Sequence, residues 1–211
     1  MRASIVAFDQ FTDIDVFLIW DLLKRVKLPN WEVEIVGDKD SHVSLGGLLI
    51  PTHGKLERAN SADVVIFTSG PGSRKKLEDP AFLGSFKLNL ERQMIASMCS
   101  GALILAKLGL LRGQEATTYP TAKAALEAFG VRVVEKPFVA NGNVATAAGC
   151  LAAQYLAGGV IERHAGSAIK DAVLKSIQPV GEGLSFSSAD LESVNKVYAP
   201  SPSSGRTPVL R

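Results

Sequence analysis

The sequence has few of the side chains that build disulfide frameworks and metal sites. It contains 2 cysteines, Cys99 and Cys150, which do not form a CxxC pair, and 3 histidines without ligand spacing. Secreted disulfide scaffolds and zinc sites need closely spaced cysteine or histidine side chains, so neither is expected here. We therefore expect no metal and no other cofactor.

An excess of charge of either sign is also absent. The chain has 23 basic and 21 acidic residues, a net charge of +2, and its longest block of like charge is Arg74-Lys75-Lys76. Such a triplet is typical of a solvated loop or the start of a helix. Because nucleic-acid binding needs a larger basic surface, we expect no nucleic acid as a partner.

Long apolar runs suited to export or to a membrane are missing as well. The N-terminus reaches Asp9 before an apolar region develops, which is unlike a secretion signal. The longest uncharged stretch, residues 137–161, is interrupted by Asn141-Gly142-Asn143 and by further glycines, so it does not predict a membrane span. We expect a cytoplasmic protein that does not bind a membrane.

What remains is a chain of 211 residues with 46% hydrophobic content, enough for one α/β domain. Strands alternate with helices, which predicts a mostly parallel sheet covered on both faces. From Pro179 onward glycine, serine and proline accumulate, so residues 1–178 are expected to form the domain and residues 179–211 a loop and tail. The expected strands are residues 4–8, 31–36, 62–68, 93–98, 116–119, 131–134, 138–140 and 144–146, with a small hairpin at 43–50; the expected helices are residues 14–26, 81–92, 102–110, 121–129, 147–163 and 165–177.

The chain is organised around an apolar run that stops at Cys99. A buried strand before it and a buried helix after it place Cys99 at a corner, flanked by the small residues Ser97 and Gly101. This is the spacing of a nucleophile elbow with cysteine in place of serine. The start of the following helix is expected to lower the pKa of the thiol below the value of about 8.5 of a free cysteine. The pattern predicts a nucleophile, although a small, buried and unreactive cysteine also fits it.

Asp15 is the acid that we expect beside Cys99. Sites in parallel sheets form at the carboxyl ends of the strands, where Phe8-Asp9, Ser69-Gly70 and Cys99 all lie. The loop that carries Asp15 leaves the first of these ends. Thr12 and Asp15 also match a capping box, in which Asp15 would only cap the first helix. Both roles are compatible with the sequence.

Further motifs follow one another along nearly the whole chain: Phe8-x6-Asp15, Ser69-Gly70-Pro71-Gly72 with Leu77-Glu78-Asp79-Pro80, Cys99-Ser100-Gly101-Ala102, Gly109-Leu110-Leu111 with Ala116-Thr117-Thr118, Gly142-Asn143, Ala147-Ala148-Gly149 and Tyr198-Ala199-Pro200. In order and spacing they resemble the DJ-1/PfpI superfamily, and within it the isonitrile hydratase-like branch. The resemblance implies a flavodoxin-like three-layer α/β sandwich, usually dimeric. It also implies that Cys99 is the nucleophile and Asp15 the acid.

The sequence departs from the pattern of that branch at several positions of the expected site. Ser100 stands where the branch usually has threonine and where protease-like members have histidine, so a local Cys-His peptidase pair is not present. Ser69-Gly70 replaces a Gly-Gly loop, and Pro71 has no N–H to offer an oxyanion. Tyr119 replaces the histidine commonly found after Ala-Thr-Thr and is a poor base at neutral pH. Base chemistry would then fall to Asp15 or to the sulfur itself.

Together the residues and the resemblance predict an enzyme acting on a small-molecule substrate, a hydro-lyase that hydrates an isonitrile to an N-substituted formamide. Cys99 would attack the terminal carbon, and Asp15 would be the general acid and base while a thioimidate forms and is hydrolysed. Backbone N–H groups of Gly70 and Ser100 would hold developing charge. The expected oxyanion and substrate-binding residues are Gly70, Ser100, Gly101 and Tyr119.

Two other functions stay open from the sequence. One is a glyoxalase-like or deglycase-like enzyme in which the same cysteine attacks the carbonyl of a small oxoaldehyde. The loss of a histidine at Tyr119 weighs against it. The other is a non-enzymatic redox or metabolite sensor in which Cys99 is oxidised to a sulfinate held by Asp15 and Ser100.

The first helix predicts a homodimer whose interface lies close to the site. It is apolar nearly all round, because five apolar residues follow one another, namely Val16, Phe17, Leu18, Ile19 and Trp20. A single sheet cannot cover all of that surface, so something else must. A second copy is the expected cover, and the alternative is that the C-terminal helices or the tail of the same chain provide it.

Overall fold

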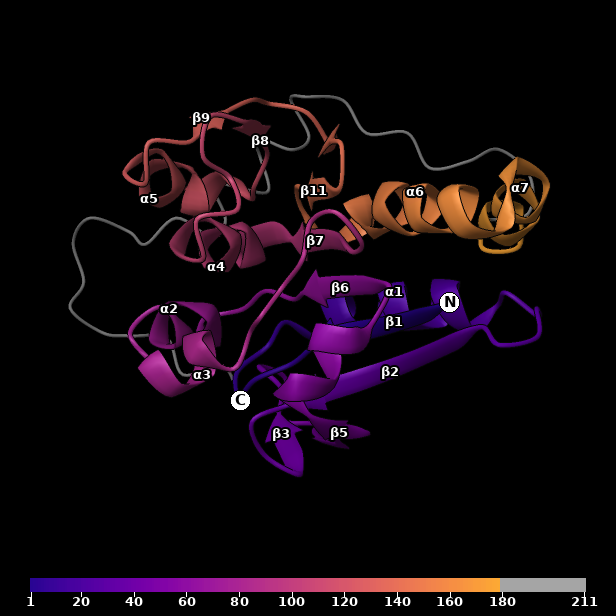
Figure 1. Ribbon diagram of the computed structural model, residues 1–211, viewed down its shortest axis with the longest axis horizontal. Helices are drawn as coiled ribbons and strands as arrows, with labels where there is room; N and C mark the ends of the chain where they lie inside the picture. The colour runs from indigo at the N-terminus through magenta and orange to yellow at the C-terminus, as the bar shows by residue number, and fades with distance from the viewer. Residues whose placement is uncertain (179–211) are drawn as a thin grey trace. The chain divides into compact units, whose positions relative to one another are not determined.

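The computed structural model describes residues 1–178, which alternate between strands and helices (Figure 1). All elements named below lie in the unit Met1–Ser176. The predicted tail at residues 179–211, which includes the Tyr198-Ala199-Pro200 motif, lies outside the described residues. Within the described part, no helix is long and apolar enough to cross a membrane.

A seven-stranded sheet forms the centre of this unit. Its order is β10-β11-β7-β6-β1-β2-β5, which Figure 1 shows from β11 near the top to β5 near the bottom. All neighbours pair in parallel except β10 and β11, which form an antiparallel hairpin. The strands are β1 Arg2–Val6, β2 Glu32–Gly37, β5 Gly54–Lys55, β6 Val64–Phe67, β7 Met94–Met98, β10 Phe138–Asn141 and β11 Val144–Ala147.

The central strands are apolar along their whole length. Every residue of β6 and of β7 is buried, as expected for parallel strands that are covered on both faces. Two small sheets lie outside the central one. The hairpin predicted at residues 43–50 is confirmed by the antiparallel pair of β3 (Ser41–Val43) and β4 (Leu49–Pro51), and β8 (Glu115–Ala116) pairs with β9 (Arg132–Val133).

The helices cover both faces of the sheet. The chain steps from β1 to β2 in one direction and from β6 to β7 and β11 in the other, so right-handed crossovers put α1 and α4 on opposite faces. Accordingly, α6 contacts α1 and α7, whereas α4 contacts α2 and α5. The predicted three-layer α/β sandwich is confirmed. The helices are α1 Asp13–Lys24, α2 Gly72–Lys76, α3 Pro80–Gly84, α4 Ala102–Lys107, α5 Lys123–Glu127, α6 Ala153–Ala165 and α7 Ser167–Lys175, with 3₁₀ turns η1 Leu56–Ser61, η2 Cys99–Gly101, η3 Pro120–Ala122 and η4 Cys150–Ala152.

The helix predicted over residues 81–92 is wrong after Gly84, where α3 ends. The side chain of Asn60 explains the early end. Its Nδ2 donates to the carbonyl of Ser85 at 2.8 Å, and the N–H of Lys87 donates to its Oδ1 at 2.7 Å. These bonds satisfy backbone groups that a longer helix would have paired internally.

The helix predicted from residue 147 starts later than expected. β11 continues to Ala147, Gly149 has a φ of +78°, and the 3₁₀ turn η4 precedes α6, which begins at Ala153. Glycine suits that backbone conformation because it has no Cβ. The turn leaves Cys150 close to the carboxyl end of β11, beside the end of β7.

Candidate active site

Cys99 occupies a sharp corner between β7 and α4. Its φ is +50°, a left-handed conformation that residues other than glycine seldom adopt. The turn η2 leads from this corner directly into α4. Thr118 Oγ1 donates to the carbonyl of Cys99 at 2.7 Å and so holds the strained peptide in place. The predicted elbow with a cysteine at its corner is confirmed.

Two glycines allow the neighbouring loops to close around this corner. A Cβ on Gly101 would lie 2.5 Å from the carbonyl oxygen of Phe67, so the elbow packs directly on the end of β6. Gly70 has a φ of +131°, and a Cβ there would lie 2.2 Å from the carbonyl oxygen of Gln10. The loops after β1 and β6 therefore touch each other beside the cysteine, as the convergence of strand ends predicts.

Asp15 is fully buried, with 0% of its surface exposed. The predicted capping box is wrong, because Thr12 makes no side-chain hydrogen bond at the start of α1. The carboxyl of Asp15 instead accepts a hydrogen bond from the hydroxyl of Ser69 on Oδ2. Its other oxygen, Oδ1, is buried and has no hydrogen-bond partner in the described part of the chain.

The thiols of Cys99 and Cys150 are the remaining polar groups that act on this carboxyl. Burial raises the pKa of Asp15 above its ordinary value, and hydrogen bonds from Ser69, Cys150 and Cys99 lower it by less. The net pKa is raised because a charged carboxylate loses its hydration and gains no cation in return. The structure thus brings Asp15 and Cys99 together, and it adds Cys150 to them.

The expectation of an acidified thiol is not met. Burial, followed by the charge of Asp15, raises the pKa of Cys99 to about 12. The hydroxyl of Ser69 and the N–H of Ser100 stabilise the thiolate, and so does the positive charge of Arg74, but these effects are smaller. The sequence predicted the helix start correctly, but it did not reveal how strongly burial of the sulfur, and then the charge of Asp15, would raise the pKa of the thiol.

The other predicted site residues surround this group in different ways. Ser100 is buried, and its hydroxyl accepts the N–H of Gly70 at 3.3 Å and lies 3.1 Å from Ser73 Oγ. The N–H of Gly70 is therefore engaged with Ser100, whereas the N–H of Ser100 binds the sulfur of Cys99. Tyr119 is partly exposed, and its ring lies 3.9 Å from where a Cβ on Gly149 would be, next to Cys150.

Three residues of the cluster were absent from the predicted set. Ser69 contacts both Asp15 and Cys99, although in the sequence it is notable only as a replacement in a Gly-Gly loop. Arg74 belongs to a triplet that looks like a solvated surface. Cys150 reaches the site through the pairing of β11 with β7, in which Ala147 is opposite Met98, and no local sequence pattern reveals that register.

The chain's three histidines are engaged away from this cluster. Nδ1 of His42 lies 3.0 Å from Asp9 Oδ1, and Nδ1 of His53 accepts the N–H of Ile35 at 3.1 Å. His164 is in the last turn of α6. None of the three influences the pKa of Asp15 or Cys99. Within residues 1–178 no group of three or more His, Cys, Asp or Glu side chains is arranged to hold a metal ion.

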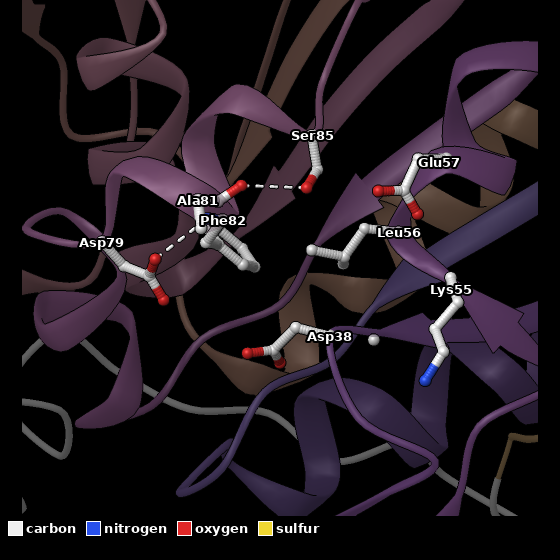
Figure 2. A pocket seen from close by; sticks show the side chains of 9 residues that line it. Asp38, Lys55, Leu56, Glu57, Asp79, Ala81, Phe82 and Ser85 are labelled. Atoms are coloured by element: carbon white, nitrogen blue, oxygen red, sulfur yellow. Dashed lines mark hydrogen bonds between the residues drawn. The ribbon is translucent and has the colours of Figure 1, made fainter.

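A separate pocket of about 160 Å³ lies beside β5 and α3 (Figure 2). Its lining includes neither Cys99 nor Asp15. Two of the carboxylates that line it are already paired, because Lys76 Nζ lies 2.8 Å from both Asp38 Oδ2 and Asp79 Oδ2. The chemistry-bearing residues are therefore outside this pocket, which is lined by Gly37, Asp38, Lys55, Leu56, Glu57, Asp79, Ala81, Phe82 and Ser85.

Comparison with known proteins identifies the family of the chain. The chain is 28% identical over 153 residues to a deglycase of Pyrococcus abyssi, covering 68% of this chain and 87% of that one. It is 27% identical over 154 residues to an isonitrile hydratase of Pseudomonas putida, covering 72% of this chain and 67% of that one. A crystal structure of a ThiJ/PfpI family protein from Pseudomonas syringae superposes with a TM-score of 0.79 and 20% identity over 93% of this chain and 85% of that one, which shows the same fold. The family model described as "DJ-1/PfpI family" matches residues 1–163, and the chain belongs to that family.

Proposed function

We propose that the protein hydrates isonitriles to N-substituted formamides, with Cys99 as the nucleophile and Asp15 as the general base and acid. The observation that carries the proposal is that the Asp15 carboxyl lies beside the Cys99 thiol. No histidine is among the groups that shift the pKa of either residue. A Cys-His pair would suit acyl transfer. A thiol beside a carboxyl of raised pKa suits addition to a carbon that also needs a proton.

The first half of the reaction uses the carboxylate as a base. Asp15 takes the proton of the Cys99 thiol as the sulfur attacks the terminal carbon of the isonitrile. The raised pKa of Asp15 makes it a better base than an exposed carboxylate, and the thiol needs this help because its own pKa is about 12. The carbanion-like carbon then takes that proton back from Asp15, and a thioimidate bound to Cys99 results.

The second half of the reaction returns the enzyme to its starting state. Asp15 removes a proton from a water molecule that attacks the thioimidate carbon. The C–S bond breaks, the nitrogen takes up a proton, and the formamide leaves as the thiol of Cys99 is restored. The N–H of Ser100 and the hydroxyl of Ser69 already contact the sulfur, so they are placed to stabilise it as a leaving thiolate.

Deglycase-like chemistry on an oxoaldehyde is the competing function, because a deglycase is among the relatives at nearly the same identity. It would use the same sulfur and the same acid. The position of Tyr119 does not favour it, since a phenol with a pKa of about 10 is a weak base near neutral pH. The Arg74 charge near the thiol does not separate the two substrates.

An assay with an aryl isonitrile tests the proposal. Turnover is measured as the loss of the isonitrile absorbance and as the appearance of the formamide mass. Wild-type protein is expected to form the formamide and Cys99→Ser to form none. Methylglyoxal is the matched competing substrate for the same two samples. Conversion of methylglyoxal without conversion of the isonitrile would overturn the proposal in favour of the deglycase-like function.

A further inference from the structure

We propose that Cys99 and Cys150 form a reversible disulfide within one chain when the protein meets a hydroperoxide, with Cys150 resolving the sulfenic acid formed on Cys99. This inference goes beyond the proposed function and does not depend on which substrate the enzyme uses. It concerns the fate of the thiol when an oxidant, rather than a substrate, reaches it.

The sheet brings the two cysteines to neighbouring strand ends. β7 and β11 pair in parallel, and their last paired residues are Met98 and Ala147. Adjacent strands lie about 4.8 Å apart, which is within the range of Cα separations that disulfides span. Cys99 directly follows Met98. Cys150 follows Ala147 after a turn at Gly149, so both side chains start from the same edge of the sheet.

Asp15 links the two sulfurs in space. The thiols of Cys150 and Cys99 both lie close enough to its carboxyl to lower the pKa of Asp15, and Cys99 also acts electrostatically on Cys150. Contact between α1 and η4 holds the acid next to Cys150. Oδ1 of Asp15 is buried and has no hydrogen-bond partner in the described residues, so it is free to accept a proton from either thiol.

An oxidant can reach the two thiols. Both cysteines are partly exposed and free. A disulfide needs an S–S bond of about 2.05 Å and a Cβ–Cβ separation of about 3.8 Å, and the short turn η4, which is only three residues long, is the segment that would move to bring the sulfurs together.

The chemistry balances with a hydroperoxide as the oxidant. Asp15 takes the thiol proton of Cys99 as the sulfur attacks one oxygen of hydrogen peroxide. The O–O bond breaks, and the departing hydroxide takes the proton from Asp15 and leaves as water. Cys99 is then a sulfenic acid. The sulfur of Cys150 attacks it, its proton passes through Asp15 to the departing hydroxide, and a second water molecule forms with the disulfide. A dithiol reductant reverses the change by thiol exchange.

Peptide mapping after hydrogen peroxide treatment tests this inference without any activity assay. Trypsin places the two cysteines in different peptides, residues 93–107 and 133–163. Under non-reducing conditions we expect a linked pair of these peptides, two hydrogen atoms lighter than their sum, which dithiothreitol separates. Wild-type protein should therefore recover both free thiols after reduction.

Cys150→Ser is the matched variant, with Cys150→Ala as a second one in case the first does not fold. Without the resolving thiol, we expect Cys99 to gain two oxygen atoms as a sulfinic acid that dithiothreitol does not remove. Sulfinic acid on Cys99 at the same rate in wild type and in the folded variant would overturn the inference. So would a linked pair found only in a species of twice the chain's mass, because that disulfide would join two copies.

Discussion

Two acids that follow β1 occupy opposite environments. Asp9 lies 2.5 Å from Lys39 Nζ and 3.0 Å from His42 Nδ1, and these partners lower its pKa to about 2. Asp15 lies only a few residues further along and is fully buried, and the loss of hydration on burial raises its pKa. The same residue type, placed by the same strand, therefore has a lowered carboxyl pKa at one position and a raised one at the other.

The difference separates a structural charge from a reactive one. Asp9 is partly exposed and paired, so its charge is stable at neutral pH and holds the loop after β2 to the end of β1. The fold buries Asp15 without an ion-pair partner among the described residues. Burying a carboxylate in this way costs stability unless a proton can be shared with a neighbouring thiol. Buried groups of this second kind concentrate at functional sites. The comparison gives four predictions, the first of which has the largest expected effect.

Replacing each of the two acids, Asp15 and Asp9, by asparagine separates their roles, and isonitrile turnover is the measurement. Asp15→Asn removes the proton carrier but keeps the shape, so isonitrile turnover should fall by about 10²- to 10⁴-fold, the usual contribution of general acid–base catalysis. Asp9→Asn, the matched control, should change turnover by far less, because Asp9 does not act on Cys99. Equal losses in both variants would mean that the effect comes from the fold and not from proton transfer.

The reactivity of Cys99 toward iodoacetamide should move in the other direction. The charge of Asp15 is the second-largest cause of the raised thiol pKa, so Asp15→Asn should lower that pKa. At about pH 8.5, where a free thiol is half ionised, alkylation should be slow in the parent protein and faster in the variant. The measurement uses a Cys150→Ser background so that one thiol is present. Slower alkylation in Asp15→Asn would contradict the proposed electrostatics.

Much of the fold followed from local patterns. The apolar runs at β6 and β7 and the corner at Cys99 were predicted because buried strands and elbows have strict local requirements. The missing part of the helix over residues 81–92 was not predictable, since it ends early through a side chain from residue 60, far away in the sequence. Tertiary hydrogen bonds of this kind override helix propensity.

The sequence predicted individual residues of the site but not how they are arranged around the sulfur. Cys99 and Asp15 were named, yet the sequence could not decide whether Asp15 caps α1 or faces the sulfur, because both fit the spacing from Thr12. Burial decides it. The roles of Ser69 and Cys150 depend on which strands are neighbours in the sheet, and no short segment of the sequence contains that information.

The two acids should also shift the pH dependence of stability in opposite directions. Asp15 binds its proton more tightly in the folded state, so between its ordinary value of 3.8 and its raised pKa the wild type loses stability as the pH rises. Asp15→Asn should therefore melt higher than wild type at neutral pH, by about 2–4 °C for each kcal/mol recovered. The gain should vanish below the ordinary value of the carboxyl.

Asp9 has the opposite sign. Its folded pKa of about 2 is below the ordinary 3.8, so its stabilising effect is complete above the ordinary value and is lost as the pH falls through about 2. Asp9→Asn should melt slightly lower than wild type at neutral pH, by a small amount because the side chain is 45% exposed and screened by solvent. Melting curves of the three proteins over a pH series check both signs, and shifts of the same sign would break the comparison.

The last and smallest expected effect concerns the surface next to Asp15. Three large apolar side chains are exposed there, on elements that contact one another: Ile14 at 41%, Leu151 at 51% and Tyr155 at 56%. The chain's own helix α6 covers part of α1, which is what the single-chain alternative to a dimer predicts. The three apolar side chains nevertheless remain exposed in the single chain. We predict that a second copy covers them.

Light scattering should then give about twice the chain mass of 22.4 kDa, and Ile14→Glu should give a folded monomer. Turnover in that monomer should decrease less than in Asp15→Asn, because the partner supports α1 from outside and does not supply the proton. Asp21→Lys, which changes an exposed charge on the same helix, is the control and should remain a dimer. A wild-type mass near that of one chain would remove the dimer. A folded Ile14→Glu monomer with full turnover would leave the dimer in place and show that the position of Asp15 is set within a single chain.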